Sequence, residues 1–163
     1  MISPRALIGA PPQMRGYQEP GIPPVIDPTA RVEAFSTVDA GVQDATRVGA
    51  RSWVMRLVHI GHDAQIGADC ELAPGTIIGG HAVLEDGVRC GIGVLVKPFV
   101  RVGVDARLGM GAVVTKDVPA GETWVGNPAE EINAARRRRA YTDDRAIWLE
   151  WWEERAAEVP CVS

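Results

Sequence analysis

Two histidines and an aspartate stand close together in the segment VHIGHDAQIG, which spans residues 58 to 67. His59 and His62 are three residues apart, and Asp63 directly follows His62. Clustered histidines are suited to bind zinc, and a histidine beside a carboxylate is suited to act as a general base. A third interpretation is that all three are polar residues on the turns of a repetitive scaffold. The choice depends on the elements that position these side chains.

An apolar residue recurs at every sixth position between Val48 and Val114, in twelve consecutive groups of six residues that we call hexads. The second position is glycine in seven hexads, and the fifth is small or β-branched in all twelve. Such a period is typical of a parallel β-helix, in which each hexad forms a short strand and a turn. The first position should point into the coil. The glycines should relieve either a positive φ or a close approach of two backbones.

Three hexads of six residues close one coil of 18 residues, so the pattern predicts four coils between residues 48 and 119. Hexads of this kind are typical of left-handed parallel β-helices, and the expected fold class is therefore all-β with a short C-terminal helical segment. The same spacing relates Ile26, Val32 and Val38, and it is interrupted at residues 39 to 47, where we expect a loop. The predicted domains are a β-helix with an irregular N-terminal segment over residues 1–130 and a helical extension over residues 131–163.

Residues that are 18 apart lie above one another in such a coil. His62 is therefore expected over Gly80, and Asp63 over His81. One coil further on, the same edge carries Lys97, Pro98 and Phe99. All three histidines of the chain fall in this patch, because His59 lies just before the edge. Scattered core histidines would not gather in this way, so the patch is the candidate functional site.

Two kinds of chemistry fit the patch. A three-histidine zinc site needs nitrogens about 2.0–2.1 Å from the metal. The γ-class carbonic anhydrases hold zinc on hexapeptide coils but space their histidines differently, and we expect no metal here. In general base catalysis, a neutral His62 takes a proton from a hydroxyl while Asp63 fixes its tautomer. Gly80 would leave space and a free N–H for a developing oxyanion.

Composition excludes several functions. The formal net charge of −4 argues against general nucleic-acid binding. No apolar run approaches the ~20 residues needed to span a bilayer, and the N-terminus lacks the pattern of a secretory signal. The three cysteines show no metal-ligand spacing, which favours free thiols and a cytoplasmic location. Cys70 and Cys90 are expected to face inward and to be poor nucleophiles.

The C-terminal residues 131–157 have a helical pattern, with a predicted helix start at Thr142, Asp143 and Asp144. A stripe that should pack on the β-helix or on a neighbouring subunit follows, formed by Ile147, Trp148, Trp151, Trp152 and Arg155. The basic run from Arg136 to Arg139 is either a solvated helix face or an anion-binding segment.

The segments VHIGHDAQIG and LAPGTIIGGHAVLEDGVRCGIGVLVKPFVRVG resemble the centre of the UDP-N-acetylglucosamine O-acyltransferases of lipid A biosynthesis. The resemblance covers about residues 7 to 150, from LIGAPPQMRGYQEP through VVTKDVPAG to EINAARRRRAYTDDRAI. It implies that an acyl group moves from an acyl carrier protein or coenzyme A thioester to a hydroxyl of a nucleotide sugar. It also implies a homotrimer with sites between subunits, and no permanently bound cofactor.

The resemblance further implies a role for each matching residue. His62 is the general base, Asp63 supports it, and the Gly80 N–H faces the thioester carbonyl. The residues implied to bind substrate are His59, His81, Lys97, Met110, Arg15, Arg137 and Arg138.

Several positions depart from the family pattern, and the chain is a shortened relative. Lys97 stands where the family often has histidine, Met14 where it has an acidic residue, and Arg15 only roughly matches a lysine. Met110 occupies a position at which larger side chains shorten the acyl pocket, so we expect short or medium acyl groups. The alternatives are an acetyl-coenzyme A dependent transferase acting on a sugar or amine, and a trimeric scaffold without chemistry.

Overall fold

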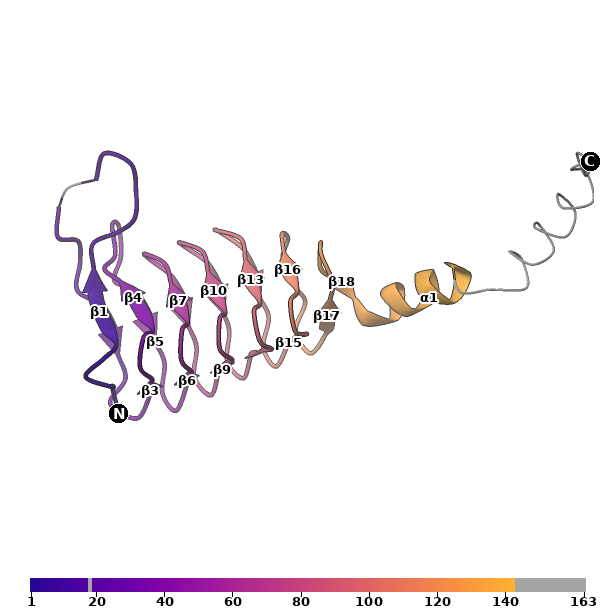
Figure 1. The fold of residues 1–163 in the computed structure, drawn as a ribbon, viewed down its shortest axis with the longest axis horizontal. Helices are drawn as coiled ribbons and strands as arrows, with labels where there is room; N and C mark the ends of the chain where they lie inside the picture. The colour runs from indigo at the N-terminus through magenta and orange to yellow at the C-terminus, as the bar shows by residue number, and fades with distance from the viewer. Residues whose placement is uncertain (18, 143–163) are drawn as a thin grey trace, which may run out of the picture. The chain divides into compact units, whose positions relative to one another are not determined.

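The computed structural model describes residues 1–17 and 19–142, and its strands are short and almost all parallel (Figure 1). The strands wind into a parallel β-helix, as the hexads predict, and Met1–Glu131 make up one compact unit. Three sheets run along this unit, and each takes one strand from each successive coil.

The sheet that carries His59, which we call the histidine sheet, has the order β1-β4-β7-β10-β13-β16. Its strands are β1 (Leu7–Ala10), β4 (Thr37–Asp39), β7 (His59–Ile60), β10 (Ile77–Ile78), β13 (Leu95–Val96) and β16 (Val113–Val114). The second sheet consists of β2 (Val25–Ile26), β5 (Arg47–Val48), β8 (Gln65–Ile66), β11 (Val83–Leu84) and β14 (Arg101–Val102). The third consists of β3 (Arg31–Val32), β6 (Trp53–Val54), β9 (Glu71–Leu72), β12 (Arg89–Cys90), β15 (Arg107–Leu108), β17 (Thr123–Val125) and β18 (Glu130–Glu131). Only β18 pairs antiparallel among these.

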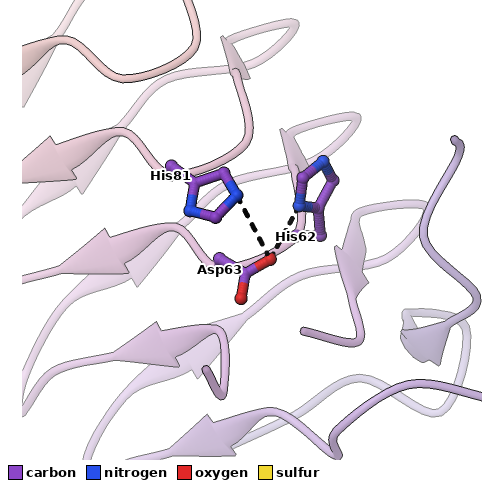
Figure 2. Close-up of side chains that lie close together, drawn as sticks. All are labelled: His62, Asp63 and His81. Atoms are coloured by element: carbon purple, nitrogen blue, oxygen red, sulfur yellow. Dashed lines mark hydrogen bonds and ion pairs between the residues drawn. The ribbon is translucent and has the colours of Figure 1, made fainter. Parts of the chain in front are cut away.

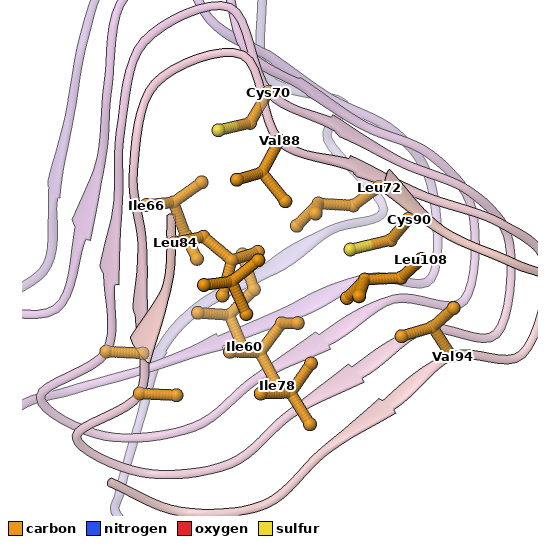
Figure 3. Packing of buried hydrophobic residues seen from close by; sticks show 14 of the residues in the cluster. Ile60, Ile66, Cys70, Leu72, Ile78, Leu84, Val88, Cys90, Val94 and Leu108 are labelled. Carbon is orange, nitrogen blue, oxygen red and sulfur yellow. The ribbon is translucent and has the colours of Figure 1, made fainter. Parts of the chain in front are cut away.

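The core follows the hexad pattern. Every first-position and fifth-position residue of the twelve hexads is at most 4% exposed. Adjacent residues of a strand point to opposite faces, so the residue preceding each first position faces outward. Figure 3 shows the first-position side chains, among them Ile60, Ile78 and Leu84, converging inside the coils. The predicted inward orientation of Cys70 and Cys90 is confirmed.

Close approach of backbones explains the second-position glycines. None of them has a positive φ. A Cβ on Gly79 would lie 2.5 Å from the Pro98 nitrogen, and a Cβ on Gly49 would lie 2.5 Å from the Gly67 carbonyl carbon. The left-handed conformation falls instead on the fourth position, which includes Asp63 (φ 59°) and His81 (φ 58°). Because the fourth position of other hexads is also left-handed, this geometry belongs to the coil and is not a strain peculiar to the site.

The coils begin before the regular hexads. Ile26, Val32 and Val38 lie in β2, β3 and β4, as their spacing predicts. The predicted loop is also present, although Asp39 still belongs to β4 and Arg47 already belongs to β5. Residues 40–46 therefore form an insertion between two coils, which we call the insertion loop.

Helix α1 (Ile132–Thr142) is the one helix of the described residues. Thr142, predicted as a helix start, is the last residue of α1. The predicted aromatic stripe lies outside the described residues. In the part of the chain that the structure describes, no helix has the length and apolar character required to cross a bilayer.

Ile77 and Ile78 provide a matched test of the inward and outward positions. Ile78 is fully buried, whereas Ile77 is 45% exposed. Ile78→Ala should lower the free energy of unfolding by about 2–5 kcal/mol, because it leaves a cavity in the core. Ile77→Ala should lower it by less than about 1 kcal/mol. Chemical denaturation of both variants measures the difference, and equal losses would contradict the assigned register.

Candidate active site

The predicted cluster of histidines forms where the turns after β7 and β10 lie on successive coils. Ile60 pairs with Ile78 in the histidine sheet, and the His81 N–H donates a 2.9 Å hydrogen bond to the His62 carbonyl. This register brings His62, Asp63 and His81 together, with both imidazole rings directed toward the carboxylate (Figure 2). The rings of His62 and His81 meet edge to face, with centroids 5.1 Å apart.

His62 and Asp63 form a carboxylate–imidazole pair although they are neighbours in sequence. The Asp63 Oδ2 atom lies 2.7 Å from His62 Nδ1 and 3.7 Å from His81 Nε2. The Asp63 side chain is only 1% exposed, whereas the His62 and His81 side chains are 18% and 23% exposed. The carboxylate is therefore enclosed, and both rings retain a path to solvent or substrate.

The insertion loop holds the Asp63 carboxylate with its backbone. The N–H groups of Val42, Gln43 and Asp44 donate to Asp63 Oδ1 at 3.2, 2.7 and 2.5 Å, and the Val42 N–H also lies 3.0 Å from Oδ2. The Asp63 N–H donates in turn to Thr46 Oγ1 at 2.9 Å. Successive backbone N–H groups that converge on one anion form a strong anion site.

These contacts keep Asp63 ionised. Burial of the carboxyl group raises its pKa, but hydrogen bonds from the Asp44 N–H, the His62 ring and the Val42 and Gln43 N–H groups outweigh burial. Together they lower the pKa of Asp63 from 3.8 to about 2. An ionised carboxylate accepts hydrogen bonds only. A neutral His62 therefore carries its proton on Nδ1 and leaves Nε2 free to accept another.

Gly80 lies against the free side of the His62 ring. A Cβ on Gly80 would lie 2.6 Å from His62 Nε2, so only glycine fits there without displacing the ring. The Gly80 carbonyl accepts a hydrogen bond from the Phe99 N–H, but the Gly80 N–H donates to no group among the described residues. An unused N–H beside a free imidazole nitrogen is the arrangement that proton transfer and oxyanion binding need.

Reasoning from the sequence alone missed Asp39 and did not foresee the stacking of Phe99. Asp39, at the end of β4, has its Oδ2 atom 3.7 Å from His59 Nε2. The Phe99 ring stacks on His81, with centroids 4.6 Å apart and an angle of 8°. The 18-residue spacing had placed Phe99 above His81, but the stacking depends on the orientation of the side chain. The sequence pattern did not indicate a role for Asp39, because the hexad spacing is interrupted beside it.

The structure does not test the roles of the remaining predicted residues. Lys97, Arg15 and Met110 are exposed, and within residues 1–17 and 19–142 none forms a side-chain hydrogen bond or ion pair with a histidine. Arg137 and Arg138 lie on α1, where the Arg137 side chain is exposed. Their roles stay predictions.

Two other kinds of chemistry can be compared with the structure: metal binding by the histidine cluster and nucleophilic attack by a cysteine thiol. Ligand atoms of His62, Asp63 and His81 all lie within 4.8 Å of one another, close enough to hold a metal ion. Asp63, however, already accepts hydrogen bonds from three backbone N–H groups and His62, which favours the carboxylate–histidine pair.

Burial raises the pKa of Cys70 to about 11 and also raises that of Cys90, so both thiols stay protonated near neutral pH.

The chain is similar to known transferases over part of their length. Residues 45–80 match the family described as bacterial transferase hexapeptide (six repeats). A UDP-3-O-acylglucosamine N-acyltransferase from Caulobacter sp. (strain K31) is 36% identical over 122 residues, which are 75% of this chain and 36% of that protein. An acyl-[acyl-carrier-protein]–UDP-N-acetylglucosamine O-acyltransferase from Herminiimonas arsenicoxydans is 35% identical over 148 residues, which are 87% of this chain and 56% of that protein.

A solved structure agrees with the sequence matches. The UDP-N-acetylglucosamine O-acyltransferase of Moraxella catarrhalis superposes with a TM-score of 0.74 at 31% identity, over 82% of this chain and 55% of that chain. The chain therefore spans only part of these curated relatives: 36% of the length of the Caulobacter protein and 56% of the length of the Herminiimonas protein.

Asp63→Asn should change how stability depends on pH. The folded pKa of Asp63 lies below its ordinary value of 3.8, so its ionisation stabilises the fold above about pH 4. That contribution, about 2 kcal/mol, should be lost as the pH falls toward 2. The variant should be less stable at pH 7 and should lack this part of the pH dependence. Asp105→Asn, at the same hexad position but exposed, is the control. Parallel stability curves for Asp63→Asn and the wild type, measured by denaturation between pH 2 and 7, would contradict the assignment.

Proposed function

The chain is a relative of the hexapeptide-repeat acyltransferases, and we propose that it moves an acyl group from a thioester to a hydroxyl of a nucleotide sugar such as UDP-N-acetylglucosamine. The observation that carries the proposal is the 2.7 Å contact between His62 Nδ1 and a carboxylate held by the insertion loop. This contact leaves His62 Nε2 as a free base beside Gly80.

His62 acts as the general base in the proposed reaction. Its Nε2 atom takes the proton of the acceptor hydroxyl as the hydroxyl oxygen attacks the thioester carbonyl carbon. Asp63 stabilises the imidazolium that forms, because its carboxylate is already ionised and bonded to Nδ1. The carbonyl oxygen becomes an oxyanion, for which the unused Gly80 N–H is a donor. Collapse of the intermediate breaks the carbon–sulfur bond, and the imidazolium returns its proton to the departing thiolate.

The acceptor is proposed to bind beside the histidines. His59 and His81 contact the sugar or its phosphates, with Lys97 and Arg15 nearby. Arg137 and Arg138 bind the nucleotide phosphates or the donor, since a guanidinium group matches phosphate oxygens in two-pronged hydrogen bonds. The protein is proposed to form a homotrimer, with each site lying between two subunits.

Exposed apolar side chains support an acyl donor. His59 on β7 is followed in register by Ile77 and Leu95, which are 45% and 39% exposed. Ile92 and Met110, also exposed, lie on the stacked turns at the other edge of the histidine sheet, where the Gly111 N–H donates to the Ile92 carbonyl. An apolar surface that begins at the histidines suits the hydrocarbon of a thioester. The donor is an acyl carrier protein or coenzyme A thioester, and no permanently bound cofactor takes part.

Transfer to an amine is the second candidate, supported by the Caulobacter relative, which is named as an N-acyltransferase. The same base would take the proton from an attacking amine. A coenzyme A thioester could then serve as donor, as in an acetyltransferase that modifies a sugar or amine.

His62→Ala should abolish most of the activity. Thiol release from acyl carrier protein or coenzyme A thioesters would be measured with and without UDP-N-acetylglucosamine. The wild-type protein should release thiol in a sugar-dependent manner, and the variant should lose about 10²- to 10⁴-fold in kcat/KM because it lacks the base. Arg89→Ala, on the third sheet, is the control and should keep full activity.

Two outcomes would contradict this proposal. Sugar-dependent release that persists in His62→Ala would exclude His62 as the base. Absence of release by the wild type with any donor would favour another acceptor, such as an amino sugar, or a scaffold without chemistry.

Met110→Gly should lengthen the preferred acyl chain. Each additional buried methylene is worth about 0.8 kcal/mol, so each carbon that newly fits should raise kcat/KM by up to about fourfold. Met110→Leu, which keeps the volume of the side chain, should keep the wild-type preference. A series of acyl thioesters of increasing length measures the effect, and an unchanged optimum in Met110→Gly would refute the role of Met110.

A further inference from the structure

Asp39 stands out because its carboxyl group is buried and incompletely paired. Its side chain is 1% exposed, and its Oδ1 atom is the one buried side-chain polar atom without a hydrogen-bond partner among the described residues. Leaving such a group unpaired costs about 1–3 kcal/mol, and more if it is charged. A buried, unpaired carboxyl oxygen in a folded protein therefore requires an explanation beyond packing.

The position of Asp39 connects it to the active site. Val38 of β4 faces the core, so Thr37 and Asp39 lie on the outer side of the histidine sheet. Thr37 pairs with His59 on the next coil, and Asp39 Oδ2 lies 3.7 Å from His59 Nε2. This is a distance for an ion pair rather than for a hydrogen bond.

The pKa of the Asp39 carboxyl group depends on two histidines of the site, His59 and His62. Burial raises the pKa of Asp39 above its ordinary value, and protonated His59 and His62 would lower it but do not outweigh burial. Asp39 and His59 therefore form a second carboxylate–histidine pair beside that of Asp63 and His62. The two pairs differ in their surroundings, because three backbone N–H groups hold Asp63 whereas none donates to Asp39 Oδ1.

We propose that Asp39 is a positioning residue that holds the His59 ring on the acceptor side of the site. The site then contains two carboxylate–histidine pairs with separate tasks. Asp63 and His62 remove the proton, whereas Asp39 orients His59, which binds the acceptor. Asp39 acts through His59 because its own side chain is too buried to touch a substrate. The acceptor-binding task rests on the function proposed above, whereas the link between Asp39 and His59 does not.

NMR of the ligand-free protein tests the link without any substrate. The chain has only three histidines, so each ring signal can be assigned by replacing His59, His62 and His81 in turn with glutamine. Asp39→Asn keeps the shape of the side chain and should move the ring signal of His59. The His81 signal, whose ring contacts Asp63 and Phe99, should stay within its linewidth.

Controls separate a local from a general effect. Asp27→Asn, on the turn after β2, should move none of the three signals. If Asp39→Asn does not fold, Asp39→Ser serves in its place. An unmoved His59 signal, or equal movement of the His59 and His81 signals, would overturn the proposal.

Steady-state kinetics tests the task of the pair. Asp39→Asn should raise the acceptor KM about tenfold and leave kcat within about twofold, because it weakens acceptor binding and spares the base. His59→Gln should behave alike, and the double variant should be no worse than His59→Gln alone. A fall in kcat with unchanged KM, or additive losses in the double variant, would refute action through His59. If the wild type used no nucleotide sugar, the proposed function would fail, while the NMR result would still decide whether Asp39 holds His59.

Discussion

Backbone hydrogen bonds between parallel strands hold residues 18 apart above one another, and the grouping of the histidines depends on that register. His59 pairs with Ile77 and Ile77 with Leu95, so one histidine lies at the start of an outward-facing apolar column. The same register sets the His62 ring against Gly80 and Asp63 beneath His81. A slip of one residue would exchange the inner and outer faces of the coil and would bury His59. The histidines and Asp63 thus occupy regular positions of the repeat.

The His62–Asp63 pair arises where the repeat is interrupted. The insertion loop turns the N–H groups of Val42, Gln43 and Asp44 onto one carboxylate instead of onto a neighbouring strand. Gly41 makes this bend possible, because a Cβ there would lie 1.6 Å from the Asp44 carbonyl oxygen. Gln65 braces the loop by donating to the carbonyls of Ala45 and Asp63 at 3.0 Å each. A four-residue departure from the hexad spacing therefore fixes the carboxylate that contacts His62 Nδ1.

The regular part of the molecule could be predicted from the sequence because its period is strict. Apolar residues at every sixth position predict the strands, the buried core and the superposition of Asp63 and His81. The site details depend on irregular features that the period does not encode. The three N–H groups that hold Asp63 come from the loop, and Asp39 stands where the pattern is broken. Spacing places Lys97 on the same edge as the histidines, but the orientation of its side chain depends on its rotamer. Arg15 lies in the irregular N-terminal segment, so spacing could not relate it to the histidines.

The central claim is that the insertion loop and Asp63 fix the tautomer of His62. Nitrogen-15 NMR of the imidazole rings measures this directly, since the two ring nitrogens differ in chemical shift when only one is protonated. In the neutral ring the account predicts that Nδ1 carries the proton and that Nε2 has the shift of an unprotonated nitrogen. Asp63→Asn should abolish this preference. A neutral His62 that carries its proton on Nε2 in the wild-type protein would contradict the account, because no free base would then face Gly80.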